Sequence, residues 1–578
     1  MGGLSPFQTL PPHHSGGVGE FWRFLTPSDF KFRAKNNLRD DQTLNPIDVS
    51  PQPSKVKQLG QLHPLTRLDG MLAAICFLAG LALYIRTLAP GVLAGDSVEF
   101  QTLASTLGMT HPPGYPVYLL IAKLFTFLPI GNIAYRVNLL SAVFAALALA
   151  LLYLDGRLLV GWRLPVLGVV YALGINGLFW IHAVIAELYT GAAALVAAEV
   201  LLLLLWRQKN RGVYLFVAGL LGGLSLGIHS TVALMAPAVI VYLLLTARRR
   251  QAWLNAIGGA ALGVALYVAG FMLLDAINAP SSYYTSVVRP SLSVWGLTAA
   301  DFNNPLKRML FQLEARQFRS LMFNQPLATT WANAKRYFSA SWFWDFLLGL
   351  GLVSLFVRRW REGVLITLAW GAMLIFIFNY AIFDIVVFYI PTFVFWFLAA
   401  ACGLGVLCEG VAWLIRRAPT DWIKKRASLA ANLAGLCLLA GLLWPVPTYA
   451  QKAIRTRLLF QSGLPDTRVN PQRAIAGRMI DGLEDNAIVF TKWMNLYLDY
   501  YVAHVERGRM GITFIQFDPQ SQAGETEAAK SLLAFIDSNL DQRPMYITEY
   551  WPGLSGHFKL VEQPGMVKLY KIERLTNP

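Results

Sequence analysis

The segment from Pro90 to Arg136 holds the densest group of reactive side chains in the sequence. Asp96 and Glu99 are three residues apart at the start of a predicted helix, so both carboxylates lie on one face near its amino end. They are the first carboxylates after the first long apolar run, which favours a functional role at a membrane surface. The alternative is helix capping, with Asp96 as the N-cap and Glu99 in the reciprocal position.

A proline-rich turn follows this predicted helix and reads His111-Pro-Pro-Gly-Tyr115-Pro. Three prolines in five positions fix the backbone φ angle and exclude a helix there. Residues 117–128 are apolar but too short to span a membrane, which predicts a helix that lies at the membrane surface. Lys123 within this segment is either a site residue or a cation that extends toward the headgroups.

Further candidates are polar or aromatic residues at the ends of apolar runs and in one long loop: Arg136, Asn138, Glu187, Tyr189, His229, Arg289, Trp295, Asp384 and Tyr389. Arg136 begins an apolar run, where a cation either meets a lipid phosphate or anchors the helix. Ionisable groups at the end of a span are costly and often functional, although a partly hydrated structural role is equally open. All four cysteines lie in apolar runs, so neither a disulfide framework nor a zinc site is predicted.

The elements that position these residues must lie in a membrane. Hydrophobic residues make up 55% of the 578 residues and charged residues only 14%, whereas soluble proteins carry about 25% charged residues. Apolar runs of about 20 residues can span a bilayer. The sequence predicts eleven spans, near residues 70–88, 135–155, 164–181, 188–206, 212–229, 230–246, 253–274, 342–357, 363–382, 385–410 and 428–447.

The excess of basic residues, which gives a net charge of +16, sets the predicted orientation. When the spans alternate, five groups of Lys and Arg fall on one side, which the positive-inside rule makes cytoplasmic. We therefore expect a loose cytoplasmic tail at 1–68, a membrane domain at 69–447, and outer segments at 89–134, 275–341 and 448–578. The basic residues are not collected on a soluble face, so a nucleic-acid partner is not predicted.

The segment 448–578 has the pattern of a small α/β domain. Strand-like runs at 487–491, 511–517, 545–549 and 568–572 alternate with helical runs at 496–504 and 527–539.

Three motifs make a family recognisable. The runs Gly95-Asp96-Ser97-x-Glu99-Phe100, His111-Pro-Pro-Gly-Tyr-Pro and Tyr135-Arg136-Val137-Asn138 resemble the bacterial membrane protein family formerly called domain of unknown function 2723. That family is related to an animal endoplasmic-reticulum protein O-mannosyltransferase. The strong resemblance covers residues 70–240, and the motifs around Glu187, Trp295 and Asp384 continue it. It implies the C-type glycosyltransferase fold: a mostly α polytopic protein of the bacterial inner membrane, with a small extracytoplasmic α/β domain.

The resemblance also implies a chemistry. Mannose or another hexose would move from a polyprenyl-phosphate donor to a hydroxyl of an exported protein, with Asp96 as general base and inversion through an oxocarbenium-like state. Glu99 and His111 complete the expected catalytic group. Contacts to the donor phosphate are expected from Arg136, His111, Arg289, Lys123 and Asn138, and other substrate contacts from Tyr115, Glu187, Tyr189, His229, Trp295, Asp384 and Tyr389. A lipid phosphate is a good leaving group, so neither a metal ion nor another cofactor is predicted.

Three rival functions remain at this level. A transporter or flippase for lipid-linked sugars would be expected to bury charges near mid-span at broken helices, whereas the acidic groups here gather at span ends. A transferase acting on a lipid or polysaccharide acceptor would share the donor but not the acceptor. A non-catalytic membrane scaffold would explain the hydrophobicity but not the concentration of reactive groups around Asp96 and His111.

Overall fold

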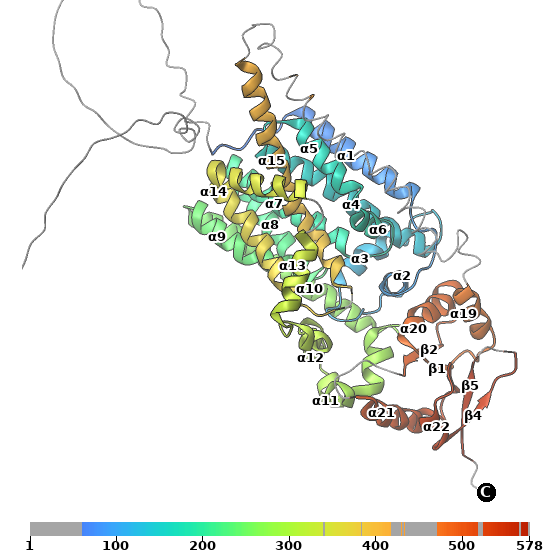
Figure 1. Ribbon diagram of the computed structural model, residues 1–578. Helices are drawn as coiled ribbons and strands as arrows, with labels where there is room; N and C mark the ends of the chain where they lie inside the picture. Colours follow the sequence, from blue (N-terminus) through green and yellow to red (C-terminus); the bar gives the residue numbers. More distant parts are fainter. Residues whose placement is uncertain are drawn as a thin grey trace, which may run out of the picture. The chain divides into compact units, whose positions relative to one another are not determined.

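The computed structural model describes residues 60–338, 342–382, 384–417, 429, 433, 471–517, 524–565 and 568–575. In the membrane part the helices, most of which Figure 1 labels, are α1 (Arg67–Arg86), α2 (Asp96–Thr106), α3 (Pro116–Phe125), α4 (Ile133–Leu159), α5 (Arg163–Gly174), α6 (Gly177–Ala183), α7 (Tyr189–Lys209), α8 (Gly212–Ser225), η3 (Ser230–Met235), α9 (Ala236–Thr246), α10 (Arg250–Ile277), η4 (Tyr284–Val288), η5 (Arg289–Trp295), α11 (Ala299–Phe302), α12 (Pro305–Leu313), η6 (Arg316–Leu321), α13 (Leu327–Phe338), α14 (Trp342–Phe378), η7 (Ile385–Phe388) and α15 (Tyr389–Arg416).

Six of the described helical stretches are long and apolar enough to cross a membrane. They are α1, α4, α7, α10, α14 and η7 with α15; a seventh span results if α5 and α6, bent by 66° relative to each other, are taken together. The structure is therefore that of a multi-pass membrane protein. The predicted count of eleven spans is not confirmed.

The difference in count has local causes. The predicted spans at 212–229 and 230–246 form shorter helices, α8 and η3 with α9. Those at 342–357 and 363–382 are both found within α14, which is two helices joined at Arg359, where the φ and ψ angles of −146° and 57° are non-helical. A Cβ on Gly363 would lie 3.4 Å from the backbone of Leu355, so the chain turns back on itself at this break. Of the predicted span at 428–447, only residues 429 and 433 belong to the part that the structure describes.

Small residues allow close helix packing in the membrane part. A Cβ atom on Gly223 of α8 would lie 2.6 Å from the carbonyl oxygen of Ala260 in α10. A Cβ on Gly259 of α10 would in turn overlap the carbonyl oxygen of Phe216. Lipid tails supply no hydrophobic drive for helix association, so the packing gained by such close approach is what holds two helices together.

A buried ionic cluster fixes the start of α1. The Asp69 carboxylate is fully buried, and the Nε atoms of Arg157 and Arg163 each donate to its Oδ1 over 2.9 Å. Thr66 and Asp69 also form a capping box at this helix start. The first helix is thereby tied to the end of α4 and the start of α5.

The carboxy-terminal part is an α/β unit, as the sequence predicted. Its elements are α19 (Pro471–Asp481), β1 (Ile488–Thr491), α20 (Trp493–Tyr500), η9 (Tyr501–Glu506), β2 (Thr513–Gln516), α21 (Gly524–Asn539), β3 (Met545–Ile547), α22 (Pro552–Ser555), β4 (Phe558–Glu562) and β5 (Tyr570–Arg574). The sheet order is β2-β1-β3-β5-β4. β1 pairs in parallel with β2 and β3, and β5 pairs antiparallel with β3 and β4.

Helix α20 and η9 connect this unit to the loops of the membrane part. The Thr102 hydroxyl of α2 donates to the carbonyl oxygen of Tyr497 over 3.0 Å. The Tyr500 hydroxyl donates to the Pro280 carbonyl over 2.7 Å and accepts from the Phe514 amide over 3.0 Å. Buried residues of α20 therefore share one hydrophobic core with α2.

Candidate active site

The start of α2 places the first carboxylate of the site. Gly95 is the N-cap residue, with a positive φ of 64° that favours glycine, and it makes no side-chain cap bond. Asp96 is the first residue of the helix proper. The capping interpretation, with Asp96 as N-cap and Glu99 in the reciprocal position, is therefore wrong, and both carboxylates are available for other contacts.

Glu99 pairs with His111 of the proline-rich turn. The His111 amide donates to Glu99 Oε1 over 2.8 Å, and its ring Nδ1 lies 2.6 Å from Oε2. The Glu99 side chain is fully buried and that of His111 is 12% exposed. Burial disfavours the charged imidazolium, but the Glu99 carboxylate, with smaller contributions from Asp96 and Glu187, raises the pKa of His111 to about 9. The His111 ring is therefore protonated at neutral pH.

Asp96 lies in an acidic environment. Burial raises the pKa of Asp96, and the nearby Glu99 adds to this effect while His111 opposes it. A carboxylate with a raised pKa is a stronger base. The best general base has a pKa close to the working pH, so a raised value brings Asp96 nearer to that optimum. Asp96 thus has the electrostatic setting that a general base requires.

Two further carboxyl groups, on loops between helices, lie close enough to Asp96 to interact with it electrostatically. The Ser97 hydroxyl donates to Glu187 Oε1 over 3.3 Å. Burial and then Asp96 raise the pKa of Glu187 well above its usual range, and the same two causes raise the pKa of Asp384. Four acidic residues therefore surround His111, although the sequence separates them by almost 300 positions.

Aromatic rings close one side of the site. The Tyr115 ring stacks on the His229 ring with centroids 6.3 Å apart, and the Tyr189 ring lies 5.2 Å from His229. Tyr115 also has a left-handed backbone, with φ of 39°. His229 Nδ1 is 2.6 Å from the Thr231 hydroxyl. These sequence-predicted residues are brought together.

The predicted phosphate ligands have structural contacts of their own. Arg136 donates from Nε, Nη1 and Nη2 to the carbonyl oxygens of Ile130, Thr126 and Gly131 at 2.6, 2.7 and 3.0 Å. Three of its five N–H groups thus hold the loop between α3 and α4, and two remain for a ligand.

Lys123 and Asn138 hold α2 in place. The Lys123 ammonium donates to the Ser105 carbonyl at the end of α2 over 2.5 Å. The Asn138 amide accepts from Gln101 over 2.8 Å and donates to the Ala89 carbonyl over 2.9 Å. Both residues position the helix that carries Asp96, and their role as donor ligands stays a prediction.

Three predicted candidates lie among other partners. The Arg289 guanidinium is 5.9 Å from the centroid of the Phe302 ring. Trp295 donates from its indole to the Ser291 hydroxyl and packs edge-on against Phe311. The Tyr389 ring packs against Tyr337 at 4.9 Å, while its neighbour Phe388 is the ring that contacts His229 at 5.1 Å.

Two residues that the sequence analysis did not predict reach the site from α20. The Trp493 ring lies edge-on to His111 with centroids 6.3 Å apart. The Tyr497 hydroxyl is close enough to the Glu99 carboxylate to interact with it electrostatically. The available signal was that Trp493 lies two residues after the end of a predicted strand, the region where functional residues of α/β proteins gather.

The same residues have the composition of a metal site. Among the described residues, Asp96, Glu99 and His111 form a group whose ligand atoms all lie within 4.8 Å of one another. Carboxylate oxygen and imidazole nitrogen together suit several divalent ions. Glu99 already accepts from the amide of His111 and contacts Nδ1 of its ring, which leaves Nε2 as the ring atom that a metal ion could bind. The prediction that no metal is needed stays a prediction.

Comparison with known proteins defines the class. Residues 96–253 match the family model described as the Protein O-mannosyl-transferase TMEM260 N-terminal domain. The fold is similar to that of ArnT from Cupriavidus metallidurans in its crystal structure bound to undecaprenyl phosphate, with a TM-score of 0.54, 13% identity, and coverage of 86% of this chain and 97% of that one. The chain thus has the C-type glycosyltransferase fold that the sequence resemblance implied.

Two relatives are more specific. The chain is 26% identical over 309 residues to Protein O-mannosyl-transferase TMEM260 of Mus musculus, covering 49% of this chain and 43% of that protein. It is 25% identical over 119 residues to Protein O-mannosyl-transferase tmem260 of Dictyostelium discoideum, covering 20% and 14%. The chain therefore spans less than half the length of the curated relatives it matches. These matches support the predicted kinship with the animal protein O-mannosyltransferases.

Proposed function

We propose that this protein is a membrane glycosyltransferase that moves mannose or another hexose from a polyprenyl phosphate to a hydroxyl group of an exported protein. The observation that carries the proposal is the position of Asp96, a carboxylate of raised pKa beside the Glu99–His111 pair. The name of the mouse relative supports a mannosyl group and a protein acceptor. The lipid in the ArnT structure supports a polyprenyl-phosphate donor.

The side chains suit an inverting displacement. The acceptor oxygen attacks the anomeric carbon while its proton passes to Asp96, and the bond from that carbon to the phosphate oxygen breaks. The leaving phosphate gains negative charge, which the protonated His111 would stabilise. Arg136 would add its two remaining N–H groups if the donor phosphate lies beside the α3–α4 loop.

The proposal includes a place in the cell. The chain would lie in a bacterial inner membrane with its amino terminus in the cytoplasm and the sheet domain outside, as the basic groups of the sequence favour. A reporter fused after the last residue tests this orientation. A reporter that is active only in the cytoplasm would reverse the assignment of donor and acceptor sides.

Transfer by the purified full chain in detergent tests the chemistry. We expect transfer from synthetic polyprenyl-phosphate mannose to a hydroxyl-bearing peptide, and none from a nucleotide sugar. Asp96→Asn should keep the fold and abolish transfer, whereas the control Asp485→Asn, whose side chain is 95% exposed, should be active. Normal transfer by a folded Asp96→Asn enzyme would remove Asp96 from the role of base.

The acceptor is tested in cells. Mass spectrometry of exported proteins should show hexose on Ser or Thr only when the gene is intact. Hexose that disappears instead from a lipid or polysaccharide fraction would favour a transferase with that acceptor.

A further inference from the structure

A cavity of about 320 Å³ opens at the carboxyl ends of β1 and β3 in the sheet domain. From the end of β1 the chain leads through α20 to β2 on one side, and from the end of β3 it leads to β4 and β5 on the other. Parallel strands whose connections diverge in this way leave a crevice, and such crevices are the usual ligand sites of open α/β sheets. The cavity therefore lies where this architecture places a ligand.

The walls of the cavity carry hydrogen-bonding groups. Lys492 directly follows β1, and Thr548 and Glu549 directly follow β3. An ion pair of 2.5 Å between Lys492 and Glu549 connects the two strand ends. Asn495 adds an exposed amide from the first turn of α20.

The deepest polar group is Asp499, which lines the cavity and is 4% exposed. Its Oδ2 accepts a hydrogen bond from the Thr491 hydroxyl over 3.0 Å. Burial raises the pKa of Asp499 to about 7, so near neutral pH the carboxyl group can either donate or accept. Hydroxyl groups on a ligand need both kinds of partner.

Size and composition favour one ligand chemistry. About 320 Å³ is at the lower end for small-molecule sites, which suits a single sugar ring better than a peptide segment. Among the described residues, the lining includes no aromatic side chain, and most of its side chains carry hydrogen-bonding groups, which disfavours a flat apolar ligand. The three basic and two acidic residues of this described lining nearly balance, so the walls do not form a dedicated anion site.

We propose that this cavity is a second, non-catalytic binding site for a saccharide unit, held by Asn495, Asp499 and Thr548. One wall of the cavity is α20 and another is α19. Helix α20 also presents Trp493 and Tyr497 to His111 and Glu99. A bound saccharide therefore contacts the helix that completes the candidate active site. The coupling of the two sites rests on the proposed function, but the binding of the saccharide does not.

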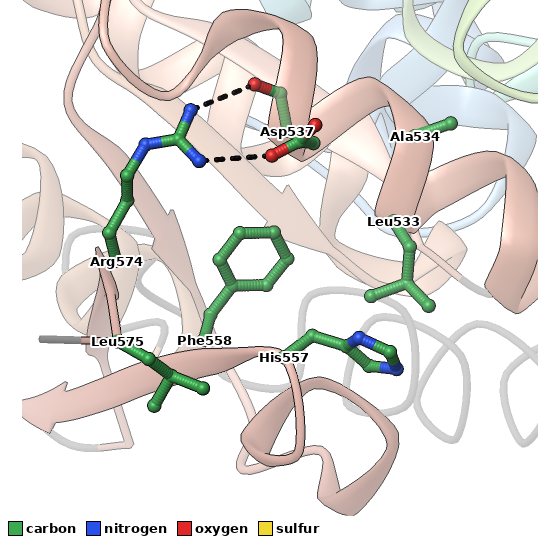
Figure 2. A pocket seen from close by; sticks show the side chains of 7 residues that line it. All are labelled: Leu533, Ala534, Asp537, His557, Phe558, Arg574 and Leu575. Atoms are coloured by element: carbon green, nitrogen blue, oxygen red, sulfur yellow. Dashed lines mark hydrogen bonds and ion pairs between the residues drawn. The ribbon is translucent and has the colours of Figure 1, made fainter. Parts of the chain in front are cut away.

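Another cavity of the same domain provides a matched control. Figure 2 shows it between α21 and the outer strands, where Arg574 pairs with Asp537 beside Phe558. Its volume is about 420 Å³, but it does not lie at the carboxyl ends of the parallel strands.

Binding by the full chain in detergent tests the proposal, with calorimetry or ligand-observed NMR and a panel of methyl glycosides of mannose, glucose and galactose, plus glucuronate and inorganic phosphate. We expect at least one glycoside to bind with Kd of about 1 mM, as a ligand of that size allows. Asn495→Ala and Asp499→Asn should each weaken binding about tenfold or more, and Asp537→Asn should not. Asn495 is exposed, so its variant should fold even if that of Asp499 does not.

Three results would overturn the site: no glycoside binds, phosphate alone binds, or Asn495→Ala leaves the affinity unchanged. The binding measurement is independent of catalysis. Saccharide binding without any transfer would support this site and contradict the proposed function. Transfer without saccharide binding at this cavity would support the proposed function and contradict the site.

Discussion

Replacing Glu99 with Gln isolates the charge that keeps His111 protonated. The side-chain amide introduced by this change would still accept the backbone N–H of His111, so the shape of the proline-rich turn should persist. The negative charge would be lost. Burial, which lowers the pKa of His111, would then be opposed only by the weaker contributions of Asp96 and Glu187.

The size of the effect follows from the pKa of His111. It is about 9 in the folded protein against a usual value of 6.5, a difference of 2.5, which corresponds to about 3 kcal/mol. Because the folded-state value is raised, protonation stabilises the fold fully below pH 6.5, and this stabilisation is lost as the pH rises through about 9. In Glu99→Gln the pKa should fall to 6.5 or below, and the stabilisation should be absent at pH 8.

NMR of protein with labelled histidine rings measures this directly. The chain has eight histidines, and the signal of His111 is assigned by its loss in His111→Asn. Glu187→Gln is the control, since Glu187 is the weakest of the three acidic contributions to the pKa of His111. The reasoning would be refuted if His111 of Glu99→Gln still titrated near pH 9, or if His111 of the unaltered protein titrated near 6.5.

Four further predictions concern packing, α20, the donor and metal ions. Gly259→Ala should lower the melting temperature by an amount equivalent to about 1–3 kcal/mol, because its Cβ overlaps a backbone oxygen of α8, whereas the adjacent Gly258→Ala, with its nearest contact at 3.9 Å, should not. Trp493→Ala should reduce transfer with little change in the melting temperature. A fall in transfer that is accompanied by a large fall in the melting temperature would indicate a purely structural role. Arg136→Ala should lower transfer by about ten- to a hundredfold and Arg136→Lys should recover only part, while full activity of either variant would contradict the assignment. Transfer activity should persist in excess EDTA. If EDTA abolished transfer and a divalent ion restored it, Asp96, Glu99 and His111 would be a metal site.

The sequence predicted helices where apolar runs were continuous, and it missed an element whose residues are mostly outside the core. The charged run from Arg358 to Glu362 separated two predicted spans, and α14 is indeed broken between them at Arg359. Strand β4 was missed because only Phe558 of its five residues is buried, and Lys559 and Glu562 lie outside the core. The other edge strand, β2, is buried along its whole length and was predicted.

The candidate site was predictable where its residues are close in the sequence. Glu99 and His111 are 12 residues apart, so one segment placed them together, although their pairing had to be observed. Thr102 and Tyr497 are 395 residues apart, so no local pattern could bring α20 to this site. Adjacent positions also diverge: Phe388 faces His229, whereas Tyr389 faces Tyr337.

The buried carboxylate of Asp69 has a consequence for the order of assembly during synthesis. Its two arginine partners lie 88 and 94 residues later in the chain, and at about 5–20 residues per second they are made roughly 5–20 s after it. An unpaired carboxylate is too costly to bury in that interval. Helix α1, with only 22% of its most apolar stretch buried in the finished fold, must therefore wait in the lipid until α4 and the start of α5 have been inserted. Helix α1 is thus made before α4 and α5 but docks only after them.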